Sequence, residues 1–195
     1  VMVIDAQATP TLARQVIKKV RSVTDKPISH LVLSHYHAVR VLGASEYKAS
    51  NIIMSSKARS MVVERGQEDW DSEFDRFPRL FKGHEEIPGL TWPTTTFDKK
   101  MSLFLGKRRV DLYFLGRAHT AGDIVIHVPD SNVLFTGDLV EYKSACYCGD
   151  AHLQDWPQTL EKIAKFQSVS LVPGRGDALT DQRQIDEAIE LTEDY

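Results

Sequence analysis

The sequence predicts an α/β fold, and three observations lead to this prediction. Apolar runs of strand length alternate with segments of helical periodicity early in the chain, which is typical of a layered α/β domain. After Thr96 the pattern turns to closely spaced strands separated by turn residues. Of the 195 residues, 42% are hydrophobic, so one sizeable core can form. We therefore expect a single α/β domain over residues 1–195.

The first half is expected to begin with a buried strand and a helix. Leu12, Val16, Val20 and Val23 recur at helical spacing behind Pro10. In order, the expected elements are a strand over 1–4, a helix over 11–23, a strand over 30–33, a helix over 42–49, a strand over 51–54 and a helix from residue 57.

A charged segment between residues 64 and 93 carries an aromatic stripe. Trp70, Phe74, Phe77 and Phe81 follow one another at steps of four, three and four, which predicts that they share one face of a helix. Such a face most often packs on the body of a domain, and the alternative is a lid or a partner surface.

The second half is expected to be rich in strands and to close with two helices. We find no internal repeat and no linker that divides the chain. The expected strands cover 102–105, 110–115, 123–128, 133–136 and 170–172, and the expected helices cover 156–166 and 181–191.

Charge and composition exclude two classes of partner. The formal net charge of −3 with mixed signs offers no basic face for nucleic acid. No apolar run approaches the roughly 18 residues that cross a bilayer, so we expect no membrane segment.

Cys146 and Cys148 are poorly spaced for a mutual disulfide. A cytoplasmic location is favoured, although compartment and oligomeric state stay open, and the apolar start without an initiator methionine predicts a missing N-terminus.

Two histidines follow the predicted strand over 30–33, in the stretch "LSHYHAVRVLG". Side chains two positions apart on an extended segment point the same way, so His35 and His37 can approach one ion together. The alternative is a satisfied polar pair at a strand end, because two ligands alone do not make a metal site.

Three later segments also place polar residues at the ends of apolar strands: "GRAHTAGD", "LFTGDLV" and "LVPGRGD". Ligands collect at the chain ends of strands in open α/β architectures. We therefore predict that His119, Asp138 and Arg175 converge on His35 and His37.

Nearly the whole chain resembles the metallo-β-lactamase superfamily, which includes glyoxalase II-like hydrolases. The resemblance rests on five motifs in this order: "IDA", "HYHAVR", "HTAGD", "TGD" and "VPGRG". The resemblance implies a four-layer αβ/βα sandwich with metal at one edge of the paired sheets, here without the usual N-terminal hairpin. It also implies that His35, His37, His119 and Asp138 bind the first metal ion, Asp138 being the bridging aspartate.

The ligands specific to a second metal ion are lost. The family pattern H-x-H-x-D-H has Asp and His where this chain has Val39 and Arg40, and the late family histidine falls on Arg175. A guanidinium group has no acceptor for a cation, so we expect no dinuclear site. Arg40 and Arg175 would replace two positive charges, and would pair with Asp138 or with an anionic substrate group.

The leading hypothesis is a mononuclear hydrolase of an ester, thioester, lactone or similar bond in an anionic small molecule. One zinc ion would lower the pKa of its bound water to roughly 7, with Asp138 as fourth ligand or orienting that water. Arg40 and Arg175 would clamp a carboxylate or phosphate, each stabilising the transition state by about 3 kcal/mol.

Two alternatives stay open. Mononuclear-iron persulfide dioxygenases of the same superfamily use a ligand set that matches His35, His119 and Asp138, which would make the chain an oxidoreductase. In the other alternative the chain holds no metal, Arg40 and Arg175 lock Asp138, and the cleft binds an anionic ligand or a protein partner.

Several smaller features have structural interpretations. Thr120, Gly122 and Asp123 are expected to shape the turn after His119, and Asp5 to support the loop under the metal edge.

Other candidate residues lie outside this motif set. Cys146, Cys148 and His152 are candidates for a softer metal site, with free loop thiols as the simpler interpretation. His84 is expected to be an ordinary surface histidine, and Tyr36 to pack rather than to react.

Overall fold

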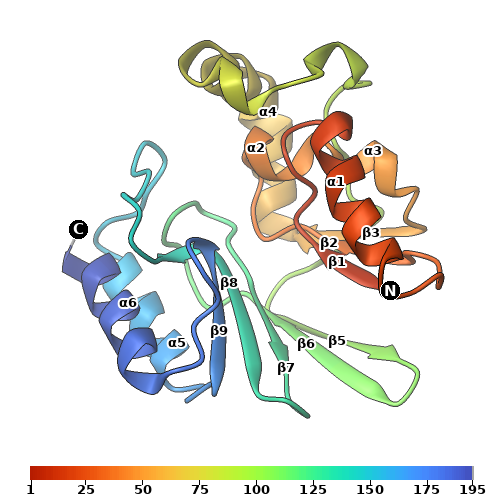
Figure 1. Ribbon diagram of the computed structural model, residues 1–195. Coiled ribbons are helices and arrows are strands. Elements are labelled where there is room, and N and C mark those ends of the chain that lie inside the picture. Colours follow the sequence, from red (N-terminus) through yellow and green to blue (C-terminus); the bar gives the residue numbers. More distant parts are fainter. Residues whose placement is uncertain (195) are drawn as a thin grey trace. The chain divides into compact units, whose positions relative to one another are not determined.

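A computed structural model describes residues 1–194, and the chain forms two compact units. The N-terminal unit covers Val1–Thr96, and the C-terminal unit begins at Phe97. Each unit has its own sheet (Figure 1). Each also has its own core of buried hydrophobic residues. No helix in the described part of the chain has the length and apolar character needed to cross a bilayer.

The N-terminal unit is built on a four-stranded sheet of order β1-β2-β3-β4, in which β1, β2 and β3 are parallel. Its strands are β1 (Met2–Ile4), β2 (His30–Val32), β3 (Asn51–Ser55) and β4 (Thr95–Phe97). Its helices are α1 (Pro10–Arg21), α2 (Ala38–Val41), α3 (Ala44–Tyr47), α4 (Ser56–Arg76) and two short 3₁₀ turns, η1 (Pro78–Leu80) and η2 (His84–Glu86).

Helices α1 and α4 begin where the local sequence favours a helix start. Thr9 accepts a hydrogen bond from the backbone N–H of Leu12 at 3.2 Å, and Pro10 occupies the first turn, where its missing N–H costs nothing. Ser55 caps α4 in the same way, through the N–H of Ala58 at 3.0 Å. Each cap satisfies a donor that the helix itself leaves open.

The single helix predicted over 42–49 is wrong, because the structure has two short helices, α2 and α3, on either side of Gly43. The N–H of Gly43 donates to the carbonyl of Gln7 at 2.9 Å. A Cβ at this position would lie 2.2 Å from the carbonyl oxygen of Ala6. The helical run is therefore interrupted by a close approach of two backbones, which only glycine permits.

The predicted aromatic helix face is correct for only half of its members. Trp70 and Phe74 lie on α4 and pack against the N-terminal core. The helix ends before Phe77, because Pro78 cannot continue it, and Phe77 is left 37% exposed. Phe81 is fully buried, but it reaches the core from beyond η1. The part of the stripe that stays buried thus serves packing.

The C-terminal unit is built on a five-stranded sheet of order β5-β6-β7-β8-β9, antiparallel except for the β8–β9 pair. Helices α5 and α6 pack against each other and against β8 (Figure 1). The strands are β5 (Lys100–Leu105), β6 (Arg108–Tyr113), β7 (Val125–Val128), β8 (Val133–Glu141) and β9 (Ser170–Arg175), and the helices are α5 (Trp156–Ala164) and α6 (Gln182–Asp194).

Strand β8 is longer than the predicted 133–136 and carries Asp138 within it rather than beyond its end. Its pairing with β9 shifts register at Gly137, whose φ of 54° lies in the left-handed region. Such a bulge bends a strand and redirects the next side chain, here that of Asp138. Some strand and helix boundaries differ from the prediction, but the α/β class predicted from the sequence is confirmed.

Candidate metal centre

His35 lies in the bend after β2 and is supported by a chain of buried hydrogen bonds. Ser34 donates its hydroxyl to one carboxylate oxygen of Asp5 at 2.9 Å, and its backbone N–H to the other at 2.8 Å. The Ser34 hydroxyl therefore accepts from His35 Nδ1, which lies 2.9 Å away. This arrangement places the ring proton on Nδ1, so Nε2 of His35 carries the lone pair that a metal ion requires.

His37 lies at the N-terminus of α2, and it is 3% exposed. Its ring centroid is 4.8 Å from that of His35, so the two histidines of the motif lie together. Nε2 of His37 is 3.9 Å from a carboxylate oxygen of Asp69, a residue of α4. Tyr36, between the two histidines, is buried in the N-terminal core and packs there as expected.

The positions that follow His37 supply no metal donor. Val39 is partly buried against the N-terminal core, and Arg40 is half-buried in the last turn of α2. An isopropyl group and a guanidinium group offer no lone pair to a cation. The expected pairing of Arg40 with Asp138 stays a prediction.

In the C-terminal unit, His119 lies in a tight turn between β6 and β7 and is 1% exposed. Asp123 accepts from the backbone N–H of Thr120 at 2.6 Å and from its hydroxyl at 2.8 Å. The Thr120 hydroxyl in turn accepts from the N–H of Gly122 at 3.1 Å. These contacts close the turn as expected, and the His119 ring rests edge-on against Trp156 at 5.7 Å.

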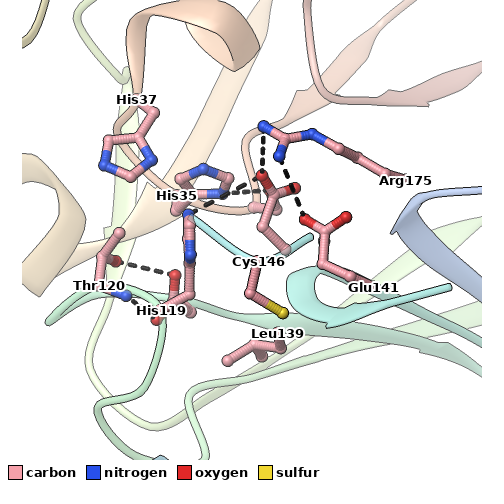
Figure 2. A network of polar contacts seen from close by, with 12 residues as sticks. His35, His37, His119, Thr120, Leu139, Glu141, Cys146 and Arg175 are labelled. Carbon is pink, nitrogen blue, oxygen red and sulfur yellow. Dashed lines mark hydrogen bonds and ion pairs between the residues drawn. The ribbon is translucent and has the colours of Figure 1, made fainter. Parts of the chain in front are cut away.

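Asp138 lies beside His119 and Arg175 in this unit. Its Oδ2 is 3.8 Å from Nε2 of His119 and 3.7 Å from a guanidinium nitrogen of Arg175. Figure 2 shows the Arg175 side chain extended toward the Glu141 carboxylate as well, and that distance is 3.8 Å. Arg175 is 37% exposed at its side chain, whereas the side chains of both carboxylates are 1% exposed.

Gly174 makes room for this aspartate. A Cβ at position 174 would lie 2.2 Å from Oδ1 of Asp138 and 2.7 Å from its backbone nitrogen. Strand β9 can therefore pass directly beside Asp138 only with glycine at this point.

The alternative metal site predicted at Cys146, Cys148 and His152 is not formed among the described residues. Cys146 and Cys148 are free thiols, and among the described residues no group of three or more His, Cys, Asp or Glu side chains includes either of them. Burial raises the pKa of Cys146 to about 12 and also raises the pKa of Cys148, so both stay protonated at neutral pH. They line a cavity of about 130 Å³ together with Trp156 and Leu160.

The structure thus gathers the predicted residues in two sets: His35 with His37 in one unit, and His119, Asp138 and Arg175 in the other. Their convergence on one ion stays a prediction. Imidazole nitrogens and a carboxylate oxygen are the donors that zinc prefers, and the Nδ1–H form of His35 leaves its other nitrogen suited to the ion, so the donor chemistry fits zinc.

Two buried acids were missed by the sequence reasoning. Asp69 continues the buried face of α4 after Val62 and Gly66, and this helical spacing could have identified it. Glu141 lies three residues after Asp138 in β8. Because alternate side chains of a strand point to opposite faces, residues three apart are not expected to be buried on the same face. Its partner Arg175 comes from another strand.

Comparison with known proteins identifies the family of this chain. A sequence model of the metallo-beta-lactamase superfamily matches residues 1–174. A metallo-beta-lactamase type 2 from Elizabethkingia meningoseptica is 32% identical over 104 residues, which cover 51% of this chain and 42% of that protein. One from Bacillus cereus is 24% identical over 181 residues, which cover 90% of this chain and 62% of that protein. The chain thus spans less than two thirds of either relative.

Solved structures show the same fold. A metallo-beta-lactamase from Pontibacter korlensis superposes with a TM-score of 0.76 at 19% identity, covering 100% of this chain and 82% of that one. The TMB-1 structure has a TM-score of 0.73 at 18% identity, covering 98% of this chain and 78% of that one.

Proposed function

Because the chain belongs to the metallo-β-lactamase superfamily, we propose that it is a metal-dependent hydrolase that works with one zinc ion. His35, His37, His119 and Asp138 would hold the ion, as the matching positions of the family imply. The observation that carries the proposal is the hydrogen-bond chain from Asp5 through Ser34 to His35, because it presets one imidazole as a neutral donor.

The zinc ion would supply a bound water with a pKa of roughly 7 and a Lewis acid for the bond to be cleaved. Asp138 would then accept a proton or hydrogen bond from that water. Its carboxylate suits this role because its side chain is 1% exposed and therefore not solvated by bulk water.

Arg175 and Arg40 would together bind the substrate. A guanidinium group is a fork of donors that matches a carboxylate or a phosphate. The substrate class is therefore an anionic small molecule with an ester, thioester, lactone or similar bond. The names of the relatives add β-lactams to the compounds worth testing.

Zinc stoichiometry tests the proposal most directly. The purified chain is stripped with chelator, reloaded with zinc, desalted and measured by elemental analysis. We expect one equivalent, and loss of most of it in His119→Ala. Hydrolysis of aryl ester, thioester, lactone and β-lactam probes should depend on that zinc. A chain that holds well under one equivalent would overturn the proposal.

A restored second site tests the mononuclear state. The triple variant Val39→Asp, Arg40→His, Arg175→His returns the family's donors, and we expect it to bind close to two equivalents of zinc. Two equivalents in the unmodified chain would contradict the one-metal proposal. Iron retained in preference to zinc would favour the dioxygenase alternative, and stability indifferent to both metals would favour the metal-free one.

A further inference from the structure

Asp69 is a buried acid that faces His37, a motif histidine of its own unit. It lies in the middle of α4, is 4% exposed, and faces the interior of the N-terminal unit. Removing a carboxylate from water costs free energy unless hydrogen bonds or charges compensate it. The groups around Asp69 therefore indicate what it does.

Its two oxygens have different neighbours. Oδ2 accepts a hydrogen bond from the backbone N–H of Ala38 at 2.6 Å, at the first turn of α2. Oδ1 is 3.9 Å from Nε2 of His37. His37 is the N-cap residue of α2, yet its side chain makes no capping hydrogen bond. Asp69 takes over that task from another helix, and the imidazole of His37 is left to point elsewhere.

We propose that Asp69 is a positioning residue for His37, and this inference rests on the proposed zinc-dependent function. A carboxylate facing Nε2 favours the ring form with its proton on Nε2, which leaves the lone pair of His37 on Nδ1. Asp69 thereby fixes both the backbone and the ring of a predicted zinc ligand.

In this proposal the two histidines of the motif carry their ring protons on different nitrogens. The hydrogen bond with Ser34 places the proton of His35 on Nδ1, whereas the carboxylate of Asp69, 3.9 Å from Nε2 of His37, would favour the proton on Nε2 there. The group that faces one ring nitrogen of a histidine fixes its tautomer and orientation, so the two rings could approach one ion through different nitrogens. The contact that orients His37 in this proposal comes from Asp69 of α4.

Glu73 provides a matched control on the same helix. It lies one turn after Asp69 and is 5% exposed, but its carboxylate pairs with Arg76 at 2.8 Å. Asp69→Asn keeps a carbonyl oxygen that can accept from the N–H of Ala38, and loses the negative charge that faces His37. Glu73→Gln removes a buried charge of the same helix from a different partner.

The test has two readouts on the full chain. Zinc affinity is measured by competition with a chromophoric chelator, and we expect Asp69→Asn to weaken it about 10- to 100-fold while Glu73→Gln leaves it unchanged. The tautomer of His37 is measured by ¹⁵N NMR of the zinc-free chain at a pH where imidazoles are neutral. We expect the Nε2–H form in the unmodified chain and a mixture in Asp69→Asn.

The outcomes separate this inference from the proposed function. The inference is overturned if His37 is in the Nδ1–H form in the unmodified chain, or if Asp69→Asn keeps both the tautomer and the affinity. If the unmodified chain binds no zinc, the proposed function fails, and the NMR measurement still decides whether Asp69 orients His37. Thermal unfolding of Asp69→Asn within a few degrees of the unmodified chain would show that α2 is still capped.

Discussion

The two sets of candidate ligands, one in each unit, differ in what surrounds them. In the N-terminal unit, acids face histidines: Asp5 acts on His35 through Ser34, and Asp69 faces His37. In the C-terminal unit, the acid that would bind metal faces a cation, Arg175. The candidate ligands of the N-terminal unit therefore face carboxylates, whereas the candidate ligand Asp138 faces a cation that would compete with a metal ion.

A second comparison, within the C-terminal unit, shows how strong that competition is. Arg109 bonds Asp111 through Nε at 2.9 and 3.0 Å and through a further short contact, which is a close two-oxygen pairing. Arg175 stays 3.7 Å from Asp138 and divides itself between Asp138 and Glu141. The Arg175–Asp138 contact is therefore looser than the Arg109–Asp111 pair.

The largest effect is expected when the histidine support of the N-terminal unit is removed. Asp5→Ala leaves the buried N–H and hydroxyl of Ser34 without their acceptors, which should cost roughly 4 kcal/mol of unfolding free energy. Urea denaturation measures the loss. Asp25→Ala, at an exposed position, is the control and should change little. An Asp5→Ala chain as stable as the control would show that the hydrogen-bond chain is unimportant.

The next effect concerns the space around Asp138. Gly174→Ala would place a Cβ 2.7 Å from the Asp138 backbone. Strand β8 or β9 must then shift, at a cost of about 3 kcal/mol. Gly66→Ala in α4 is the control, because this position has room for a Cβ, which would contact Leu90 at an ordinary distance of 3.4 Å. Helix propensity predicts about 1 kcal/mol of stabilisation there. Equal effects of the two substitutions in urea denaturation would contradict the close approach.

A third effect uses Asp111 as the reference for a close arginine pair. Arg109, helped by Ser102 and Tyr113, holds the pKa of Asp111 well below its usual range. Asp111→Asn should cost about 2 kcal/mol at neutral pH.

The sign of its pH dependence follows from the lowered pKa. The stabilisation by Asp111 is complete above the unfolded-state pKa of about 3.9, and is lost as the pH falls below it toward the folded-state value. The difference in unfolding free energy between the unmodified chain and Asp111→Asn should therefore be constant from pH 7 to pH 5 and shrink below about pH 4. A constant difference down to pH 2 would contradict this assignment.

The same contrast explains what could be predicted from the sequence. His35, His37, His119 and Asp138 can be named as candidate ligands from the sequence because motif spacing and strand ends are local signals, and their binding of metal stays a prediction. The α/β class followed from apolar periodicity for the same reason.

Other features depend on distant parts of the chain. The break at Gly43 arises from the backbone of Ala6 and Gln7, which no local pattern includes. Asp69 and Glu141 acquire their roles from partners on other elements. Local sequence thus identifies candidate ligands more readily than the residues that face them from distant elements.

The smallest expected effect tests the sharing of Arg175 itself. Glu141→Gln removes one of the two carboxylates that Arg175 contacts. The guanidinium group should then interact more strongly with Asp138 and compete more strongly with zinc for that carboxylate. Because Arg175 is 37% exposed, solvent screening limits the change to about 1 kcal/mol, or about fivefold in zinc affinity. Arg175→Ala should shift the affinity by a similar factor in the opposite direction, since the competing cation is gone. Chelator competition on both variants decides the matter: if neither affinity moves, Arg175 does not compete for Asp138, and the charge difference between the two sets of candidate ligands has no bearing on metal binding.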